Sequence, residues 1–254
     1  MLSGPVLAAA SFAIGLLIGA TSMGGAALMT PFLVLALGVR PVLAVGTDLC
    51  FAFLTKVCGA WVHWRQGTVD VTTALRLAMG SVPGVLAGAA FVSRLRGWGI
   101  DADRALRPAI AAALMLVAVM LVARTFWNGS LPLTRHLARH ARPATIAWGG
   151  AVGFLVGLTS VGSGTLVAPF LLVLFSRHPA RVVGTDVFHA AVLGGAGALF
   201  HAQAGNVDWR LLPVLLAGSL PGVLVGSYLA PRLPARVLRL AMGAVLLAVG
   251  GRLL

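Results

Sequence analysis

Long apolar stretches separated by short charged segments form the dominant pattern of this sequence. Residues 1–39 carry no charged side chain, and neither do residues 143–176. Shorter uncharged stretches cover residues 77–93, 108–123, 187–207 and 211–231. One membrane-spanning helix needs about 20 apolar residues. The pattern therefore predicts several transmembrane helices, and the two longest stretches are too long for one helix each.

Each of the two longest apolar stretches is interrupted near its middle by Gly and Ser, at residues 21–25 and 159–164. A glycine inside a helix costs about 1 kcal/mol. The arms that follow, residues 26–38 and 165–176, reach only about 20 Å at 1.5 Å per residue, less than the hydrocarbon core of about 30 Å. We therefore predict two re-entrant helix hairpins whose Gly/Ser tips lie at membrane depth.

The sequence repeats itself after a shift of 138 positions. Residues 15–88 align without gaps with residues 153–226, and 30 of the 74 aligned pairs are identical. The sequence Val-Gly-Thr-Asp, for example, occurs at both 45–48 and 183–186. Transporters are commonly built from two such repeats. Each half is predicted to hold one hairpin and three full spans, which places the second half in the membrane with inverted topology.

The predicted fold class is thus an all-α polytopic membrane protein with two inverted-topology repeats, each a broken re-entrant hairpin plus about three transmembrane helices. Full spans are expected at 42–64, 72–92 and 105–125, and at 180–202, 209–230 and 236–253. The first repeat covers residues 1–125, a linker loop covers 126–143, and the second repeat covers 144–254.

Composition supports a membrane protein and excludes several other classes. Of the 254 residues, 59% are hydrophobic and 10% are charged, against about 25% charged in an ordinary soluble domain. The net charge of +13 comes from scattered arginines, so we expect no nucleic-acid partner. No Gly-Lys-Ser/Thr phosphate loop, no His-Glu-x-x-His motif and no glutamate occur. The sequence therefore predicts neither an enzyme nor a metal site nor a cofactor.

The hairpin tips are the first candidate binding site. A helix broken at depth exposes unpaired N–H groups and a positive dipole end, which together attract an anion. Glycine permits close backbone approach, and serine adds a hydroxyl donor. The alternative is that these small residues only let helices pack closely. The candidate substrate-binding residues are Ser22, Gly24, Gly25, Ser160, Gly162, Ser163 and Gly164.

Asp48 and Asp186 each follow Gly-Thr a few residues into an apolar helix. An acidic side chain at the bilayer centre costs about 2.5–3.5 kcal/mol, so such residues usually have a function, such as proton transfer. The alternative is an N-cap, in which Thr47 or Asp48 satisfies the first turn of a helix beginning at the interface. Thr185 and Asp186 form the equivalent pair, and both interpretations stay open here.

A lone lysine, Lys56, lies eight residues after Asp48, and its repeat partner is Gly194. An ammonium within the membrane needs a partner or a cavity. Lys56 is therefore predicted to neutralise a substrate anion, or to pair with Asp48 or a carbonyl, and it joins the candidate binding residues. Thr55 falls on the same helix face as Asp48.

Three histidines complete the candidate polar residues. His189 follows Asp186 by three positions and is expected deep in its helix, where it could carry a proton. His63 and His201 lie near the ends of equivalent helices, where extension of the side chain to the membrane surface is the ordinary explanation.

Two segments resemble the signature G-x-G-G-G-x-x-x-x-P-x-L of the TauE/SafE sulfite exporter family: SMGGAALMTPFL at 22–33 and SVGSGTLVAPFL at 160–171. GTDL at 46–49 and the segment 55–70 are also similar to that family. Serine replaces the first glycine at both tips, Ala26 the last in the first half, and Ser163 another in the second. The resemblance implies an integral carrier of the bacterial inner membrane for small anions, typically sulfite or organosulfonates.

Two hypotheses of function follow. The first is a secondary transporter that moves a small sulfur-containing anion through a midplane site formed by the two Gly/Ser breaks. The alternative is a cation- or proton-linked carrier that uses the paired aspartates. In both, the partners are a small substrate and the lipid bilayer, and the sequence leaves open whether the protein forms a homo-oligomer.

Overall fold

The computed structural model describes residues 4–21, 26–126, 141–174, 179–229 and 234–254, and the regular structure in these ranges is helical. The first half contains α1 (Gly4–Thr21), α2 (Ala26–Pro31), a π-helical turn (Phe32–Ala36), α3 (Pro41–Arg65), α4 (Val71–Gly97) and α5 (Ala102–Phe126). The second half contains α7 (Ala141–Thr159), α8 (Ser163–Leu174), α9 (Pro179–Gln203), α10 (Leu211–Leu229) and α11 (Ala235–Leu253). The predicted all-helical architecture is confirmed.

Within the described residues, five helices are long and apolar enough to cross a membrane: α3, α4, α5, α9 and α10. They coincide with five of the six full spans predicted from the uncharged stretches. The sixth predicted span corresponds to α11, which forms a helix of 19 residues but contains Arg236, Arg239 and Arg252. The three arginines within 19 residues distinguish α11 from the five candidate spans.

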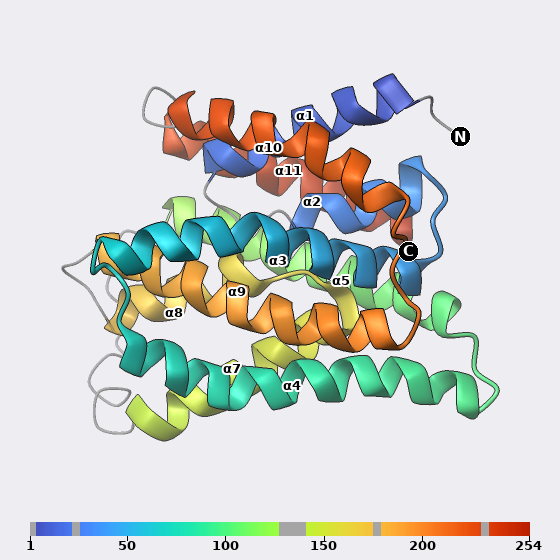
Figure 1. Ribbon diagram of the computed structural model, residues 1–254, viewed down its shortest axis with the longest axis horizontal. Helices are drawn as coiled ribbons and strands as arrows, with labels where there is room; N and C mark the ends of the chain where they lie inside the picture. Colours follow the sequence, from blue (N-terminus) through green and yellow to red (C-terminus); the bar gives the residue numbers. More distant parts are fainter. Residues whose placement is uncertain (1–3, 22–25, 127–140, 175–178, 230–233) are drawn as a thin grey trace.

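Helices of one half pack mainly on helices of the other half. The pairs with the most extensive contact are α4 with α7, α1 with α10, α3 with α9, and α5 with α11. Figure 1 shows α3 and α9 side by side in the middle, α1, α10 and α11 on one side of them, and α4 and α7 on the other. By the 138-residue shift, α1 is equivalent to α7 and α10 is equivalent to α4. The α1–α10 and α7–α4 pairs are therefore the same packing of one half on the other, formed twice.

Glycines allow the outer pairs to approach closely. A Cβ atom on Gly15 of α1 would collide with the backbone of Ser219 in α10, and a Cβ on Gly153 of α7 would collide with the backbone of Ser81 in α4. Gly15 and Gly153 are repeat partners, as are Ser219 and Ser81. The same close helix contact, which needs a residue without a side chain, is therefore built twice.

The central helices α3 and α9 are held by two equivalent hydrogen bonds. The backbone N–H of Asp208, just after α9, donates to Thr47 Oγ1 near the start of α3 at 2.9 Å. The backbone N–H of Asp70, just after α3, donates to Thr185 Oγ1 near the start of α9, also at 2.9 Å. Each helix thus begins beside the end of the other, so α3 and α9 are antiparallel.

The second hairpin folds back on itself as the sequence predicts. The indole N–H of Trp148 in α7 donates to the carbonyl of Leu166 in α8 at 3.3 Å. The same indole stacks on Phe170 with ring centroids 5.8 Å apart. At 12 residues, α8 spans about 18 Å, so it is shorter than the apolar core of a bilayer.

Candidate functional site

The break between α7 and α8 is buried and has irregular backbone. Ser160 adopts a φ of 61° and Gly162 a φ of 113°. A left-handed φ is uncommon for serine and is often found at functional sites. Ser160 is 1% exposed and Val161 is 0% exposed, so this backbone is enclosed by protein. The equivalent tip of the first hairpin, with Ser22, Gly24 and Gly25, lies outside the described residues.

Asp48 of α3 contacts this break from the opposite half of the protein. Its side chain is fully buried. Its Oδ2 atom accepts hydrogen bonds from Thr30 Oγ1 at 2.5 Å and from Ser160 Oγ at 3.0 Å. Within the described ranges, its other oxygen, Oδ1, has no hydrogen-bond partner. The carboxyl group therefore joins α2, α3 and the α7–α8 break, and one of its oxygens is unpaired as far as the described residues show.

Lys56 lies two helical turns beyond Asp48 on α3 and reaches the other end of the break. Its ammonium donates to Ser163 Oγ, at the first residue of α8, at 3.0 Å. The charge of Lys56 interacts with the carboxylates of both Asp48 and Asp186. We refer to Thr30, Asp48, Lys56, Ser160 and Ser163 as the polar cluster. The sequence placed Lys56 and the second tip among the candidates, and the structure brings them together.

The N-cap interpretation of Thr47 and Asp48 is wrong. Helix α3 begins at Pro41, so these residues are the seventh and eighth of the helix, and the same holds for Thr185 and Asp186 in α9, which begins at Pro179. The two threonines connect the halves, as described above. Asp70 and Asp208 cap the helices that follow, α4 and α10, because their Oδ1 atoms accept from the N–H groups of Thr73 and Leu211 at 2.9 and 3.1 Å.

The three histidines have different environments. His189 is fully buried, and its Nε2 lies 2.8 Å from Ser81 Oγ of α4, which agrees with its predicted depth. His201 is also fully buried, so the predicted extension of its side chain to the membrane surface is wrong. His63 is half-buried, and its Nδ1 lies 2.9 Å from Thr68 Oγ1 in the loop after α3.

Thr55 does not join the polar cluster. Its hydroxyl donates to the carbonyl groups of Phe51 and Ala52 in its own helix, at 2.9 and 3.0 Å. Facing the same side as Asp48 is therefore not enough to bring this hydroxyl to the site, because an intrahelical acceptor is closer.

Sequence reasoning missed three hydroxyl groups near the site: Thr30, Ser81 and Thr165. Thr30 binds Asp48, Ser81 binds His189, and Thr165 Oγ1 is buried without a hydrogen-bond partner. Thr30 and Ser81 are lone hydroxyl residues in apolar stretches, whereas Thr165 follows Ser163 by two positions. The repeat partners of Thr30 and Thr165 are the alanines 168 and 27, so this difference between the repeats was the available signal.

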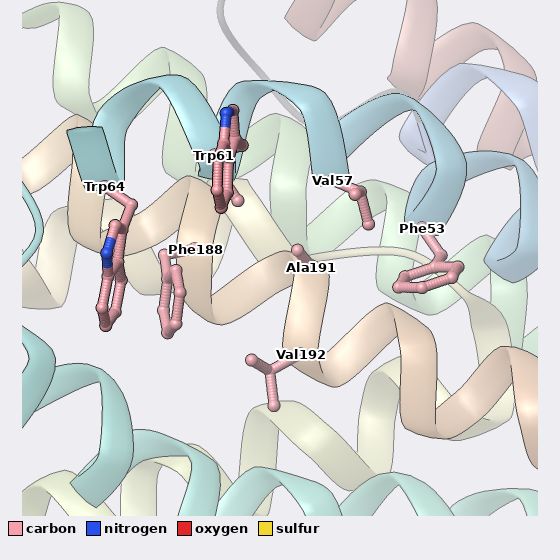
Figure 2. A pocket seen from close by; sticks show the side chains of 8 residues that line it. Phe53, Val57, Trp61, Trp64, Phe188, Ala191 and Val192 are labelled. Atoms are coloured by element: carbon pink, nitrogen blue, oxygen red, sulfur yellow. The ribbon is translucent and has the colours of Figure 1, made fainter. Parts of the chain in front are cut away.

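A second feature is an apolar surface groove of about 450 Å³ between α3 and α9 (Figure 2). It is lined by Phe53, Val57, Ala60, Trp61, Trp64, Phe188, Ala191 and Val192. Trp64 and Phe188 stack at one end with ring centroids 5.3 Å apart. No member of the polar cluster lines this groove, so it is separate from the buried site.

The long apolar helices and the buried charged side chains together define a polytopic membrane protein with a polar site in its interior, the arrangement of membrane transporters. A family model described as "Sulfite exporter TauE/SafE" matches residues 7–253. The chain belongs to this family, and it is a membrane transporter and not an enzyme.

Curated relatives agree with this assignment. The chain is 38% identical to the "Probable membrane transporter protein YjnA" of Bacillus subtilis (strain 168), over 95% of this chain and 96% of the relative. It is 28% identical to YunE of the same organism, also named a probable membrane transporter protein, over 95% and 92% of the two chains. No solved structure matches significantly. The bacterial relatives and apolar helices identify an integral membrane protein of the bacterial cell membrane.

Proposed function

We propose that this protein is a secondary transporter for a small sulfur-containing anion, either sulfite or an organosulfonate. The observation that carries the proposal is the 3.0 Å hydrogen bond between Lys56 Nζ and Ser163 Oγ. It brings an ammonium to the first residue of a short buried helix. A positive side chain and the positive end of a helix dipole then face the same point.

The backbone at the start of α8 supports an oxyanion site there. The first N–H groups of a helix have no carbonyl partner within it, and those of Ser163, Gly164 and Thr165 occupy these positions in α8. The hydroxyl of Thr165 is buried, and no described residue forms a hydrogen bond with it. Oxygen atoms of a sulfite or sulfonate group would accept from these donors, and Gly162 and Gly164 leave room for close approach.

The reciprocal packing of the halves supports two further parts of this proposal. Antiparallel α3 and α9, held by the matching Thr47–Asp208 and Thr185–Asp70 hydrogen bonds, are what inverted repeats would produce. In that arrangement residues 1–125 and 144–254 form the repeats and residues 126–143 connect them. The first tip, with Ser22, Gly24 and Gly25, would then complete the site from the other half.

Transport assays in proteoliposomes test the assignment of the site. We expect Lys56→Gln to reduce the initial rate of sulfite or methanesulfonate uptake by more than about tenfold, since the ammonium contact with a bound anion is lost. Arg65→Gln is the matched control, because Arg65 is exposed at the end of α3 and should leave the rate within about twofold. Equal rates for wild type and Lys56→Gln would refute the assignment.

The alternative of a cation- or proton-linked carrier has one observation in its favour, the buried Asp48 Oδ1 atom without a hydrogen-bond partner. A carboxylate oxygen in that state can accept a proton or a cation. The two hypotheses are compatible if the cation travels with the anion.

A further inference from the structure

The charges around the proposed anion site present a physical difficulty. Two carboxylates, Asp48 and Asp186, are close enough for their charges to interact with the single ammonium of Lys56. With all three ionised, these three described side chains together carry one excess negative charge. Charges interact more strongly in a medium of low dielectric constant than in water. An anion entering beside Lys56 would therefore be repelled by the carboxylate charge that Lys56 does not balance.

The excess negative charge follows from a difference between the repeats. Both repeats supply the aspartate, at positions 48 and 186. Only the first supplies the ammonium, because Gly194 stands at the position equivalent to Lys56. The second supplies His189 where the first has Phe51, and this imidazole is hydrogen-bonded to Ser81 of α4. The duplicated helices thus provide two acids but one permanent base.

The hydrogen bonds of Asp48 indicate where the charge can be neutralised. Both hydroxyl donors, from Thr30 and Ser160, bind the same oxygen, Oδ2. The other oxygen, Oδ1, is buried and has no hydrogen-bond partner among the residues that the structure describes. A proton on Oδ1 would remove the negative charge while Oδ2 keeps both hydrogen bonds as a carbonyl-like acceptor. The geometry around Asp48 therefore suits a neutral carboxylic acid as well as a carboxylate.

We propose that each monovalent anion bound at Lys56 is accompanied by one proton taken up on Asp48 Oδ1, so that the two are transported together. The inference rests on the proposed function. The other titratable groups that face this region are Lys56 and the Cys50 thiol from α3 and Asp186 and His189 from α9. Asp48 is the carboxyl group whose hydrogen bond with Ser160 joins α3 to the α7–α8 break.

The proposal predicts the direction in which the affinity for the anion changes with pH. While Asp48 is ionised, anion binding requires a proton from solution, so the affinity for the anion should fall about tenfold for each unit of pH increase. Once Asp48 is protonated in the free protein, the affinity should become independent of pH. The probe must not titrate itself, which favours methanesulfonate, a strong acid, over sulfite.

Calorimetric titration of the purified full chain with methanesulfonate tests the inference directly. Measured in two buffers of different ionisation enthalpy, wild-type protein should take up close to one proton per anion above about pH 7. Asp48→Asn should still bind the anion with no proton uptake and with less than about twofold change in affinity between pH 6 and pH 8. Asp101→Asn, at an exposed residue near the start of α5, is the matched control and should behave as wild type.

The outcomes separate the inference from the proposed function. Anion binding by wild type without proton uptake, or undiminished uptake by Asp48→Asn, would overturn the inference alone. The inference would also be overturned if sodium, in place of choline in the buffer, tightened anion binding and no proton were taken up. The coupled ion would then be a metal cation. Failure of wild type to bind either sulfite or methanesulfonate at any pH would overturn the proposed function as well. The wild-type proton count needs no variant, so a poorly folded Asp48→Asn would leave the test intact.

Discussion

Helices α3 and α9 are equivalent elements of the two repeats, yet they differ at the positions that matter for chemistry. Both have 25 residues, begin with proline and carry Gly-Thr-Asp as their sixth to eighth residues. Both use the threonine of that motif to accept a hydrogen bond from the loop of the other half. Beyond the motif, α3 has Phe51 and Lys56 where α9 has His189 and Gly194.

The comparison separates scaffold from site. Residues that position the helices are the same in both repeats, because each half must fit the other in the same way. The side chains that occur once are Lys56 of α3 and His189 of α9, whereas the aspartate of the polar cluster is present in both repeats. An ammonium within the membrane is costly to place, and one copy is enough to contact one bound anion. The two repeats therefore share the residues that position the helices, but only the first supplies a lysine.

The largest effect is expected from substituting the glycine that both helices share in their Gly-Thr-Asp motif. A Cβ on Gly46 of α3 would collide with the backbone carbonyl of Asn206, and one on Gly184 of α9 would lie 2.7 Å from the backbone carbonyl of Thr68. Since backbone cannot move aside easily, Gly46→Ala should lower the free energy of unfolding by about 3 kcal/mol, the upper end for overpacking, and Gly184→Ala by somewhat less. Fluorescence-detected size exclusion of the detergent extract measures the folded fraction.

The control for this pair is Gly97→Ala at the end of α4, where a Cβ would meet nothing within 4 Å. It should elute as wild type does. Normal folding of Gly46→Ala would mean that the contact between α3 and the loop after α9 is looser than the structure has it.

These shared residues were also the ones that sequence reasoning handled well. The lengths of the apolar stretches predicted the helices and the second break, and the 138-residue shift showed which positions of the two halves are equivalent. It could not place Ser163 beside Lys56 or Ser160 beside Asp48, because these contacts depend on how α7 and α8 cross α3. The burial of His201 was missed for the same reason, since distance along a helix does not show which face packs against a neighbour.

A medium effect concerns equivalent serines with unequal partners. Ser81 Oγ lies 2.8 Å from His189 Nε2, whereas Ser219, its repeat partner, is fully buried with an Oγ atom that has no partner. Ser81→Ala should lower the free energy of unfolding by about 1–3 kcal/mol, because it leaves a buried ring nitrogen unpaired. Ser219→Ala should be neutral or slightly stabilising. Thermal unfolding in detergent distinguishes them, at roughly 2–4 °C per kcal/mol for a chain of this size, and equal shifts would contradict the asymmetry.

The smallest effect comes from making the two helices alike in charge. Gly194 of α9 is buried, and a Cβ there would lie at an ordinary distance of 3.6 Å from Phe53 of α3. Gly194→Lys adds the missing second ammonium, so the two carboxylates are balanced without a proton. Methanesulfonate should then bind about tenfold more tightly than to wild type at pH 8 and lose its pH dependence, a gain of about 1.4 kcal/mol. Gly97→Lys adds the same charge far from the site and should change neither property. Tighter binding that still takes up one proton per anion would mean that the excess negative charge is not what couples proton to anion.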